Sequence, residues 1–348
     1  MRILSDFVKK MWPVLAVALI FLISLVDWIN MSKTQQKAVT QVDFAMNTVI
    51  NYCFYGENAE DALAECRELV DELEHTLSAT WAGSDLLKLR DAAGKKSVKV
   101  SPETFSLLEK AALLHEETGG RFDVTIGPLV KLWNITGTEP KIPADADINE
   151  TMKLVGTAPV LDAQAGTAFL TIEGQQIDFG GIAKGYACTR LREICDTYGV
   201  TNGYISLGGN MMVLEEMDNH FGIRDPGGSV TAYFAKLILA GKTMATAGGY
   251  ERYFEADGKT YHHILDPATG YPAETDLLSV SVISEDGALA DALSTALFIM
   301  GREEADAYLT NHPEIRAVLA DDAGTVWVYG DIPGFSIHEE SGFRLGTR

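Results

Sequence analysis

Two side chains in the last third of the chain have the types and spacing of a metal site. Asp291 and Thr295 are four residues apart on a predicted helix, so a carboxylate and a hydroxyl share one helical face. Hard oxygen ligands on a rigid element suit Mg²⁺, which binds few protein groups and leaves positions for phosphate oxygens. An isolated Asp-x-x-x-Thr is usually a solvated helix face, so this pair gains meaning only from the residues around it.

A predicted hairpin precedes that helix and carries two adjacent histidines. It spans residues 250–265 and turns at Asp257-Gly258, a dipeptide typical of tight hairpin turns. His262 and His263 follow one another on the return strand, so their side chains point to opposite faces. A rigid polar turn and a strand at Leu278–Ile283 are predicted between the hairpin and the Asp291 helix.

A second informative stretch covers residues 177–187 and predicts a strand, a glycine turn and a helix to about Tyr198. Gly180-Gly181 would bring bare backbone N–H groups to a helix N-terminus, where the helix dipole favours a phosphate. Lys184 adds a formal positive charge there. The spacing fits neither the dinucleotide fingerprint nor a P-loop, and a Gly-Gly pair before a helix is more often only a structural turn.

Composition limits the class of protein and its partners. A chain of 348 residues with 47% hydrophobic and 22% charged residues can bury a large core and is globular. Its formal net charge of -21 argues against nucleic-acid binding, because nucleic-acid phosphates require a basic surface. Any phosphate ligand must therefore be met by local cations, either a metal ion or individually placed Lys and Arg side chains.

The amino terminus is predicted to be a membrane element. Arg2, Lys9 and Lys10 precede the apolar run Pro13–Val26, which is near the lower length limit for a membrane span. No small-x-small cleavage site follows it, so we expect an uncleaved signal anchor over residues 1–30, a linker over 31–40 and one domain over 41–340. The basic residues predict a cytoplasmic amino terminus and a single-pass protein of the cell membrane with its body outside. The alternative is a cleaved signal and an exported body.

Local patterns predict several elements of the body. Residues 42–52 predict a single strand, and an apolar stripe predicts a helix from about Asn58 to Leu77. Ser101-Pro102 predicts the start of another helix, which ends near Thr118, because Ser suits the N-cap and Pro the first helical position. A shorter helix is predicted over residues 145–154.

The four cysteines show no metal-binding spacing. Cys188 and Cys195 lie seven residues apart on one predicted helix, too far apart to bridge each other. A Cys53–Cys66 disulfide is possible in an exported protein, but buried free thiols are the favoured prediction.

Taken in order, the motifs of the chain resemble those of the ApbE family, the flavin transferases that attach FMN covalently to proteins. The resemblance extends from Met46 to about Trp327. Two departures are Met46-Asn47-Thr48, where the family usually has Met-Gly-Thr, and Trp81, which stands beside Thr80 where an aromatic often follows Leu-Ser. The matching blocks are Phe122–Val130, Asp178–Tyr186, Ser206–Gly209, Gly222–Pro226, Thr246–Tyr250, His263–Pro272 and Asp291-Ala292-x-x-Thr295.

The resemblance implies an α+β fold of two lobes, with largely antiparallel sheets, packed helices and FAD in the cleft between the lobes. It implies a Mg²⁺-dependent enzyme that transfers FMN from FAD to a Thr or Ser of an acceptor protein through a phosphoester bond, with release of AMP. Acceptors would be membrane redox proteins, such as the flavin subunits of Nqr- or Rnf-type complexes. The alternatives are a FAD pyrophosphatase and a non-catalytic surface protein that scavenges flavin. The Asp291/Thr295 pair argues against binding alone, because flavin storage needs no metal.

The resemblance also assigns residues to roles. His263 would be the base for the acceptor hydroxyl, with a pKa near neutrality. His262 faces the other side of the strand and is not expected to be catalytic. The metal would be held by Asp291, Thr295 and the backbone carbonyl of Gly181, with Ser294 as a further ligand. FAD contacts would be made by Met46, Thr80, Arg121, Phe122, Asp123, Asp178, Lys184 and Leu265.

Overall fold

The structure is a computed structural model that describes residues 37–229 and 231–347. The predicted signal anchor over residues 1–30 lies outside this part of the chain. Among the described residues, none of the helices combines the length and the apolar character needed to span a bilayer.

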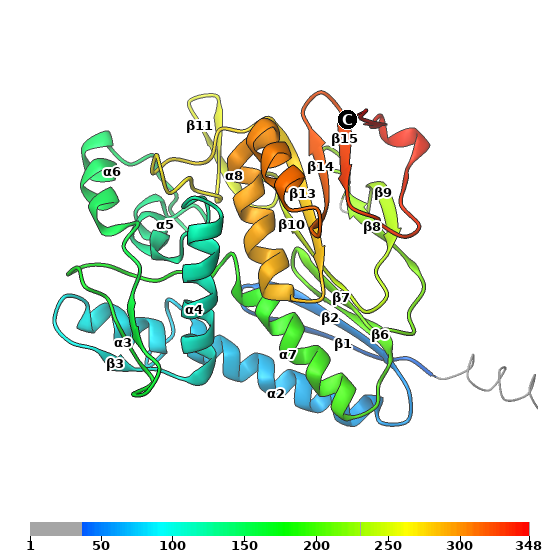
Figure 1. The fold of residues 1–348 in the computed structure, drawn as a ribbon, viewed down its shortest axis with the longest axis horizontal. Coiled ribbons are helices and arrows are strands. Elements are labelled where there is room, and N and C mark those ends of the chain that lie inside the picture. Colours follow the sequence, from blue (N-terminus) through cyan, green and yellow to red (C-terminus); the bar gives the residue numbers. More distant parts are fainter. Residues whose placement is uncertain (1–36, 230, 348) are drawn as a thin grey trace, which may run out of the picture.

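A nine-stranded sheet is the centre of the fold (Figure 1). Neighbouring strands are antiparallel, except for the parallel pair at the β15–β17 edge. In spatial order the strands are β1 (Val39–Ala45), β2 (Thr48–Tyr55), β6 (Asn202–Leu207), β7 (Asn210–Val213), β10 (Thr243–Ala247), β13 (Leu277–Ser284), β14 (Arg316–Asp321), β15 (Thr325–Tyr329) and β17 (Arg344–Leu345).

Three helices cover one face of this sheet: α2 (Ala59–Leu77), α7 (Ala183–Thr197) and α8 (Gly287–Asn311). The predicted apolar stripe of α2 is buried, including Cys66, Val70 and Leu73. Burying such a stripe removes apolar surface from water and stabilises the helix on the sheet. Gly301, with φ 72° and ψ 174°, interrupts α8.

The opposite face of the sheet packs against a three-stranded sheet of β8 (His220–Arg224), β9 (Tyr233–Ile238) and β16 (Ser336–Ile337). A separate apolar cluster fills the space between the two sheets and includes Phe234, Leu237 and Val318. Strand β13 is therefore buried along most of its length, because α8 covers one side and this cluster the other.

The remaining elements form the other side of the molecule in Figure 1. One separate apolar cluster among them contains Leu129, Trp133, Ile148 and Leu265, whereas other buried residues of these elements, such as Leu86 and Leu107, belong to the main core. The elements are α3 (Asp85–Ala92), α4 (Pro102–Glu117), η1 (Val124–Ile126), α5 (Gly127–Trp133), α6 (Asp145–Thr151), η2 (Met152–Leu154), the small sheet of β3 (Val98–Lys99), β5 (Thr167–Phe169) and β4 (Val160–Asp162), and the hairpin of β11 (Tyr253–Ala256) and β12 (Lys259–His262). The α+β class and the mostly antiparallel sheets are confirmed.

Several local predictions are confirmed by the described residues. The α4 helix begins as predicted, since the Ser101 hydroxyl accepts a hydrogen bond from the backbone N–H of Thr104. The β11–β12 hairpin turns at Asp257-Gly258, both of which have positive φ. All four cysteines are buried free thiols, so the disulfide alternative is not realised.

Two strand predictions are wrong. Residues 42–52 are not one strand but the β1–β2 hairpin, which turns at Met46 and Asn47 with φ of 50° and 57°. Asn tolerates this left-handed conformation, but Met carries no such signal, so the turn is hard to detect from the sequence. The segment before the Gly180-Gly181 turn is extended but forms no sheet ladder; the N–H of Asp178 donates instead to the carbonyl of Val124.

Candidate active site

Two helix N-termini meet at the centre of the candidate site. Gly185 in the first turn of α7 lies against Gly287 at the start of α8. A Cβ atom on Gly185 would lie 2.0 Å from the Gly287 carbonyl oxygen, and one on Gly287 would lie 2.2 Å from the Gly185 oxygen. Only glycine permits this backbone approach, and it brings the positive ends of both helix dipoles to the same place.

The Asp291 carboxylate lies at this crossing. Its Oδ2 accepts a hydrogen bond from the Gly185 N–H at 2.9 Å and lies 3.7 Å from Lys184 Nζ. Asp291 is buried, so it is not the solvated helix position that its spacing alone could indicate. Lys184 Nζ donates to the Gly180 carbonyl at 2.6 Å, which ties the glycine turn to the same group.

Two further predicted metal ligands, Gly181 and Thr295, lie close to each other. A Cβ on Gly181 would lie 3.3 Å from Thr295 Oγ1 and 3.3 Å from the Phe122 ring, so Gly181 passes directly over Thr295. A carboxylate, a hydroxyl and a backbone carbonyl are hard donors, and this donor set fits Mg²⁺. The described residues contain no group of three or more His, Cys, Asp or Glu side chains placed for a metal. This candidate site uses only one such side chain.

Ser294, the fourth predicted ligand, is engaged with the backbone of its own helix. Its buried hydroxyl donates to the Asp291 backbone carbonyl at 2.8 Å, one turn back in α8. Thr295 makes the same type of contact more weakly, at 3.3 Å, and is only partly buried. The Thr295 oxygen is therefore the more available of the two hydroxyl oxygens.

Asp178 shapes the glycine turn from its other side. Its Oδ1 accepts the N–H of Gly180 at 2.7 Å. Removal from water raises the pKa of the Asp178 carboxyl, and the Gly180 N–H and the Lys184 charge act in the opposite direction. The turn is thus held by Asp178 and Lys184 together.

His263 is oriented by the backbone of Arg252. The His263 N–H donates to the Arg252 carbonyl at 3.0 Å, and Nδ1 lies 3.2 Å from the same oxygen. A carbonyl can only accept, so in the neutral ring the proton sits on Nδ1 and Nε2 keeps its lone pair. Burial lowers the pKa of His263 to about 3, with further lowering by the positive charges of Arg252 and Lys184. The expected pKa near neutrality therefore does not hold for the ligand-free protein.

His262 has a different environment, as the strand alternation predicts. Its Nε2 pairs with the Ala273 carbonyl at 3.0 Å, and its Nδ1 accepts the Ile264 N–H at 3.3 Å. The ring also contacts Phe298 of α8 edge-on, with 5.5 Å between centroids. Both nitrogens are occupied, which suits a structural residue.

Arg252 is the site residue to which the sequence analysis assigned no role. Its Nη2 donates to the Asn47 carbonyl at 2.8 Å, across 205 residues of sequence. This bond places the turn containing Met46 next to the start of the β11–β12 hairpin, which His263 directly follows. The sequence did contain a signal for Arg252: it is a basic residue in a very acidic chain, and it lies one strand before the two histidines.

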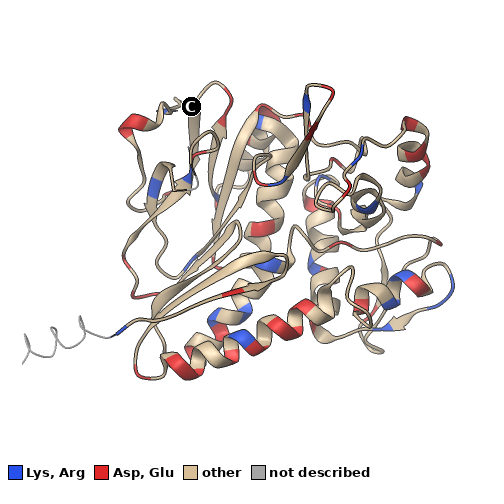
Figure 2. Cartoon of the chain, turned by 180° about the vertical axis from the view of Figure 1, so that it is seen from behind, with Lys and Arg blue, Asp and Glu red and all other residues tan. Residues whose placement is uncertain are grey.

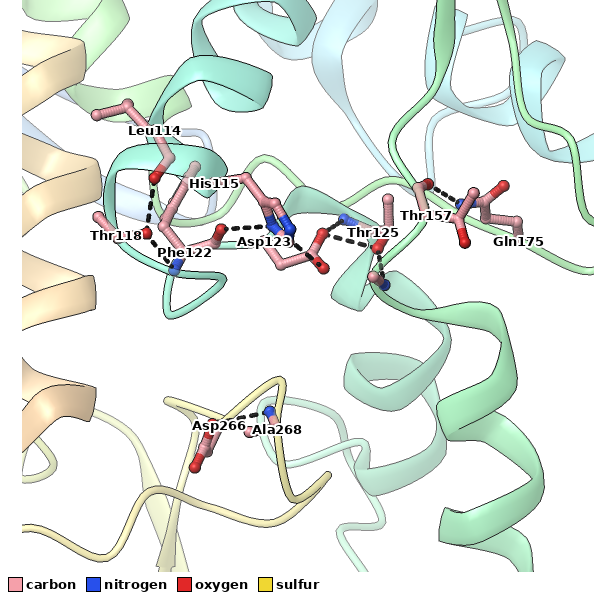
Figure 3. A network of polar contacts seen from close by, with 11 residues as sticks. Leu114, His115, Thr118, Phe122, Asp123, Thr125, Thr157, Gln175, Asp266 and Ala268 are labelled. Carbon is pink, nitrogen blue, oxygen red and sulfur yellow. Dashed lines mark hydrogen bonds and ion pairs between the residues drawn. The ribbon is translucent and has the colours of Figure 1, made fainter.

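Phe122 and Asp123 belong to a second group of predicted flavin contacts (Figure 3), which Arg121 and Leu265 adjoin in the sequence or through Asp266. Arg121 pairs with Glu304 through two hydrogen bonds of 3.1 and 2.7 Å and lies 3.7 Å from Asp266, which follows the buried Leu265. Asp123 Oδ1 accepts from the N–H and hydroxyl of Thr125, both at 2.7 Å. Its Oδ2 is buried, has no hydrogen-bond partner among the described residues and lies 3.6 Å from His115 Nδ1. Phe122 joins this group to the first through its contact with Gly181.

Thr80 stands apart from both groups. It lies in the exposed loop after α2, with its hydroxyl 3.2 Å from Ser78 Oγ, and Trp81 beside it packs on His75 with 4.2 Å between centroids. In the described part of the chain, no hydrogen bond or ion pair connects Thr80 to His263, Lys184 or Asp291. Surface hollows of about 720 and 750 Å³ lie near Trp327 and between α2 and α7, and neither includes a predicted site residue.

Comparison with known proteins supplies the context for this geometry. The model of the ApbE family matches residues 46–319. The curated FAD:protein FMN transferase of Klebsiella pneumoniae (strain 342) is 37% identical over 253 residues, covering 72% of this chain and 79% of the relative. The protein of the same name from Treponema pallidum is 34% identical over 277 residues, covering 74% and 76%.

Solved structures show the same fold. The ApbE protein from Thermotoga maritima superposes with a TM-score of 0.77 at 31% identity, covering 86% of this chain and 97% of that one. The flavin transferase ApbE from Vibrio cholerae gives a TM-score of 0.74 at 24% identity, covering 88% and 98%. The arrangement of sheet and helices described above is thus a known one.

The environment of His263 leads to a testable expectation for its titration. Because its pKa in the folded protein is lowered below the ordinary value, we expect the ring to stay neutral, with the proton on Nδ1, down to pH 5 or below. Nitrogen-detected NMR of the ligand-free protein measures both properties. Arg252→Gln removes one neighbouring positive charge and should raise the pKa. The unfolded chain binds this proton first as pH falls, so this histidine makes folding less favourable below its ordinary pKa. A ring that is protonated at pH 6 would contradict the assignment.

Proposed function

The chain belongs to the ApbE family and is a FAD:protein FMN transferase, and from this premise we propose that it is a Mg²⁺-dependent enzyme that releases AMP. The observation that carries the proposal is the convergence of Asp291, Thr295 and Gly181 at the N-terminus of α7. These are one carboxylate and two neutral oxygens, which leaves metal positions for phosphate oxygens. Asp291, Thr295 and the Gly181 carbonyl would hold the ion, with the Ser294 hydroxyl supporting Asp291 or serving as a further ligand.

Asp291, Thr295 and the Gly181 carbonyl would hold Mg²⁺, which would supply positive charge to the FAD diphosphate. The protein adds Lys184 and the N–H groups at the start of α7, since an anion is stabilised at a helix N-terminus. In a chain with a net charge of -21, these local positive groups have to offset the repulsion of a diphosphate. FAD would lie between the two sides of the molecule, in contact with Met46, Thr80, Arg121–Asp123, Asp178, Lys184 and Leu265.

His263 acts as the general base in the proposed transfer. Its Nε2 takes the proton of the acceptor Thr or Ser hydroxyl as the oxygen attacks the phosphorus of the FMN half. The bond between that phosphorus and the bridging oxygen breaks, and the electron pair leaves with AMP. A neutral imidazole whose Nδ1 proton is held by the Arg252 carbonyl has its lone pair ready on Nε2. Negative phosphate oxygens nearby would raise its pKa towards the range where it accepts a proton.

We propose a membrane redox protein as the acceptor, such as the flavin subunit of an Nqr- or Rnf-type complex. We also propose that the chain is anchored by its amino-terminal segment, with the catalytic domain on the extracytoplasmic side. Both rest on the family and on the basic-then-apolar pattern of residues 1–30. Reporter fusions truncated after about Thr40 should be active only outside the cytoplasm; a reporter active inside would reverse the topology.

The role of Asp291 is best tested with Asp291→Asn. The amide oxygen can still accept from the Gly185 N–H, so the α7–α8 crossing should survive, whereas the charge for Mg²⁺ is lost. We expect turnover at fixed Mg²⁺ to fall by about 10²-fold or more, the scale on which one preorganised electrostatic group acts. Mg²⁺ binding, measured by calorimetry, should weaken in parallel.

Two neighbouring variants serve as controls. Thr295→Val should also weaken Mg²⁺ binding, whereas Ser294→Ala should leave it nearly unchanged, because the Ser294 hydroxyl is engaged with the helix backbone. Normal Mg²⁺ affinity in Asp291→Asn would remove Asp291 from the ligand set. A large effect of Ser294→Ala would assign Ser294 as a direct ligand.

His263→Ala separates chemistry from binding. A general base acts in the transition state, so FAD affinity should stay within a few-fold of the wild type. FMN transfer, followed by the intact mass of the acceptor, should fall by about 10²–10⁴-fold. AMP release measured in the same samples reports hydrolysis by water, which does not require the same oriented base. Equal losses of FAD affinity and activity would make His263 a binding or structural residue.

A further inference from the structure

An apolar surface on the β1–β2 hairpin is not explained by the fold. Val42, Phe44 and Val49 are 62%, 71% and 49% exposed, respectively. Phe44 and Val49 are direct cross-strand partners, and Val42 lies two residues along β1 on the same face. We call these three residues the hairpin patch. A contiguous exposed apolar surface of this kind marks an interaction site more often than a chance arrangement does.

The patch faces away from the helices. Asp43, between Val42 and Phe44, points to the other side of the sheet, where its carboxylate is bound by Arg67 of α2. On β2, Ile50 lies next to Val49, points the opposite way and is buried. The hairpin thus buries one face against the helices and presents the patch on the other, and β1 is the last strand at this edge of the sheet. Figures 1 and 2 show the hairpin from its two sides.

The patch continues to the candidate active site. Phe44 and Val49 flank the hairpin turn, whose Asn47 carbonyl accepts from the Arg252 guanidinium at 2.8 Å. The Arg252 carbonyl in turn holds the backbone N–H of His263 at 3.0 Å. Figures 1 and 2 both show the tip of the hairpin beside the N-terminal end of α7. Lys184 lies in the first turn of this helix, and Asp291 accepts a hydrogen bond from Gly185 there. An apolar surface therefore leads directly to the base.

We propose that the hairpin patch is the docking surface for the acceptor protein, with uncharged apolar side chains near its Thr or Ser seated on Phe44 and Val49. This inference rests on the proposed function, because it uses His263 as the base that the acceptor hydroxyl has to reach. A second copy or a membrane seated on the patch would cover the approach to His263, whereas the acceptor has to lie there to react. An apolar contact also suits so acidic a chain, because it can bind a partner protein that carries no basic surface. A rigid aromatic such as Phe44 is the type of residue that contributes strongly at interfaces.

The test uses the double variant Phe44→Ser/Val49→Thr and a purified flavin subunit of an Rnf-type complex as the acceptor. We expect kcat/KM for the acceptor to fall about tenfold or more, chiefly through KM, as expected when a central aromatic contact is lost. The FAD dissociation constant should stay unchanged, because neither side chain is placed in the flavin or metal site. The melting temperature should also stay unchanged, since both side chains are exposed.

Two further variants sharpen the result. Leu113→Ser on α4 removes a side chain that is 61% exposed but lies outside the patch, and it should leave acceptor kinetics unchanged. Phe44→Leu keeps the apolar surface and should retain most of the wild-type kcat/KM. Calorimetric binding of the acceptor without FAD should show the same order of affinities, so docking is tested separately from chemistry.

Distinct outcomes separate docking from the proposed function. Unchanged acceptor kinetics and binding in the double variant would overturn the docking surface. Two other results would also overturn it. One is a wild-type dimer that the double variant no longer forms although its acceptor kinetics persist. The other is wild-type binding to phosphatidylcholine vesicles that is lost in the double variant while acceptor kinetics persist. If the wild type binds the acceptor through the patch but transfers no FMN to it, docking stands and the proposed reaction with this acceptor fails.

Discussion

The close approach of α7 and α8 is the constraint on which the candidate site depends. At Gly185 and Gly287 the two backbones are so near that a single methyl group on either would collide with the other helix. This contact allows a side chain of α8 to reach the first turn of α7, where Asp291 accepts the Gly185 N–H. The same crossing brings Thr295 under Gly181. The positions of the candidate metal ligands are therefore determined by the packing of two helices on the sheet.

A second constraint is electrostatic. The chain is strongly acidic, yet the chemistry of its family acts on a diphosphate, so positive groups have to be gathered locally. Lys184 is held between the Gly180 carbonyl and Asp291, and Arg252 lies beside His263, whose backbone N–H its carbonyl accepts. These charges and burial hold the pKa of His263 low in the ligand-free protein. An anionic ligand would relieve that effect and so, in the proposed mechanism, couple the protonation of His263 to the presence of substrate.

The position of His263, the proposed base, follows from the strands. His263 directly follows the short β11–β12 hairpin, and its ring and backbone are both held by one carbonyl, that of Arg252. Arg252 also contacts the turn of the β1–β2 hairpin and so links the base to the edge of the nine-stranded sheet. The surface leading to the base is therefore formed by the first two strands of the described chain. This arrangement explains why an apolar edge of the main sheet lies beside a polar reaction site.

What the sequence determined by itself was mostly local. The Asp291–Thr295 spacing, the Ser101-Pro102 helix start and the Asp257-Gly258 turn depend on residues a few positions apart, and all three are realised in the fold. The family could also be recognised from the order of the motifs, because each motif is a short run of residues that can be read without knowing its spatial neighbours. The sequence failed at Met46-Asn47, where a left-handed turn carries no glycine, and at Ile177–Phe179, where an extended segment has no ladder partner.

Only the tertiary structure decided which distant groups meet. Asp291 and Gly185 are 106 residues apart, and Arg252 and Asn47 are 205 apart, so no periodicity connects them. The burial that lowers the pKa of His263, and the exposure of Phe44 beside the buried Ile50, depend on which faces the helices cover. Local propensity sets the conformation of each segment, but contacts between segments are fixed by how their surfaces pack. The sequence therefore identified candidate residues for this site, but only the fold determined how they are arranged.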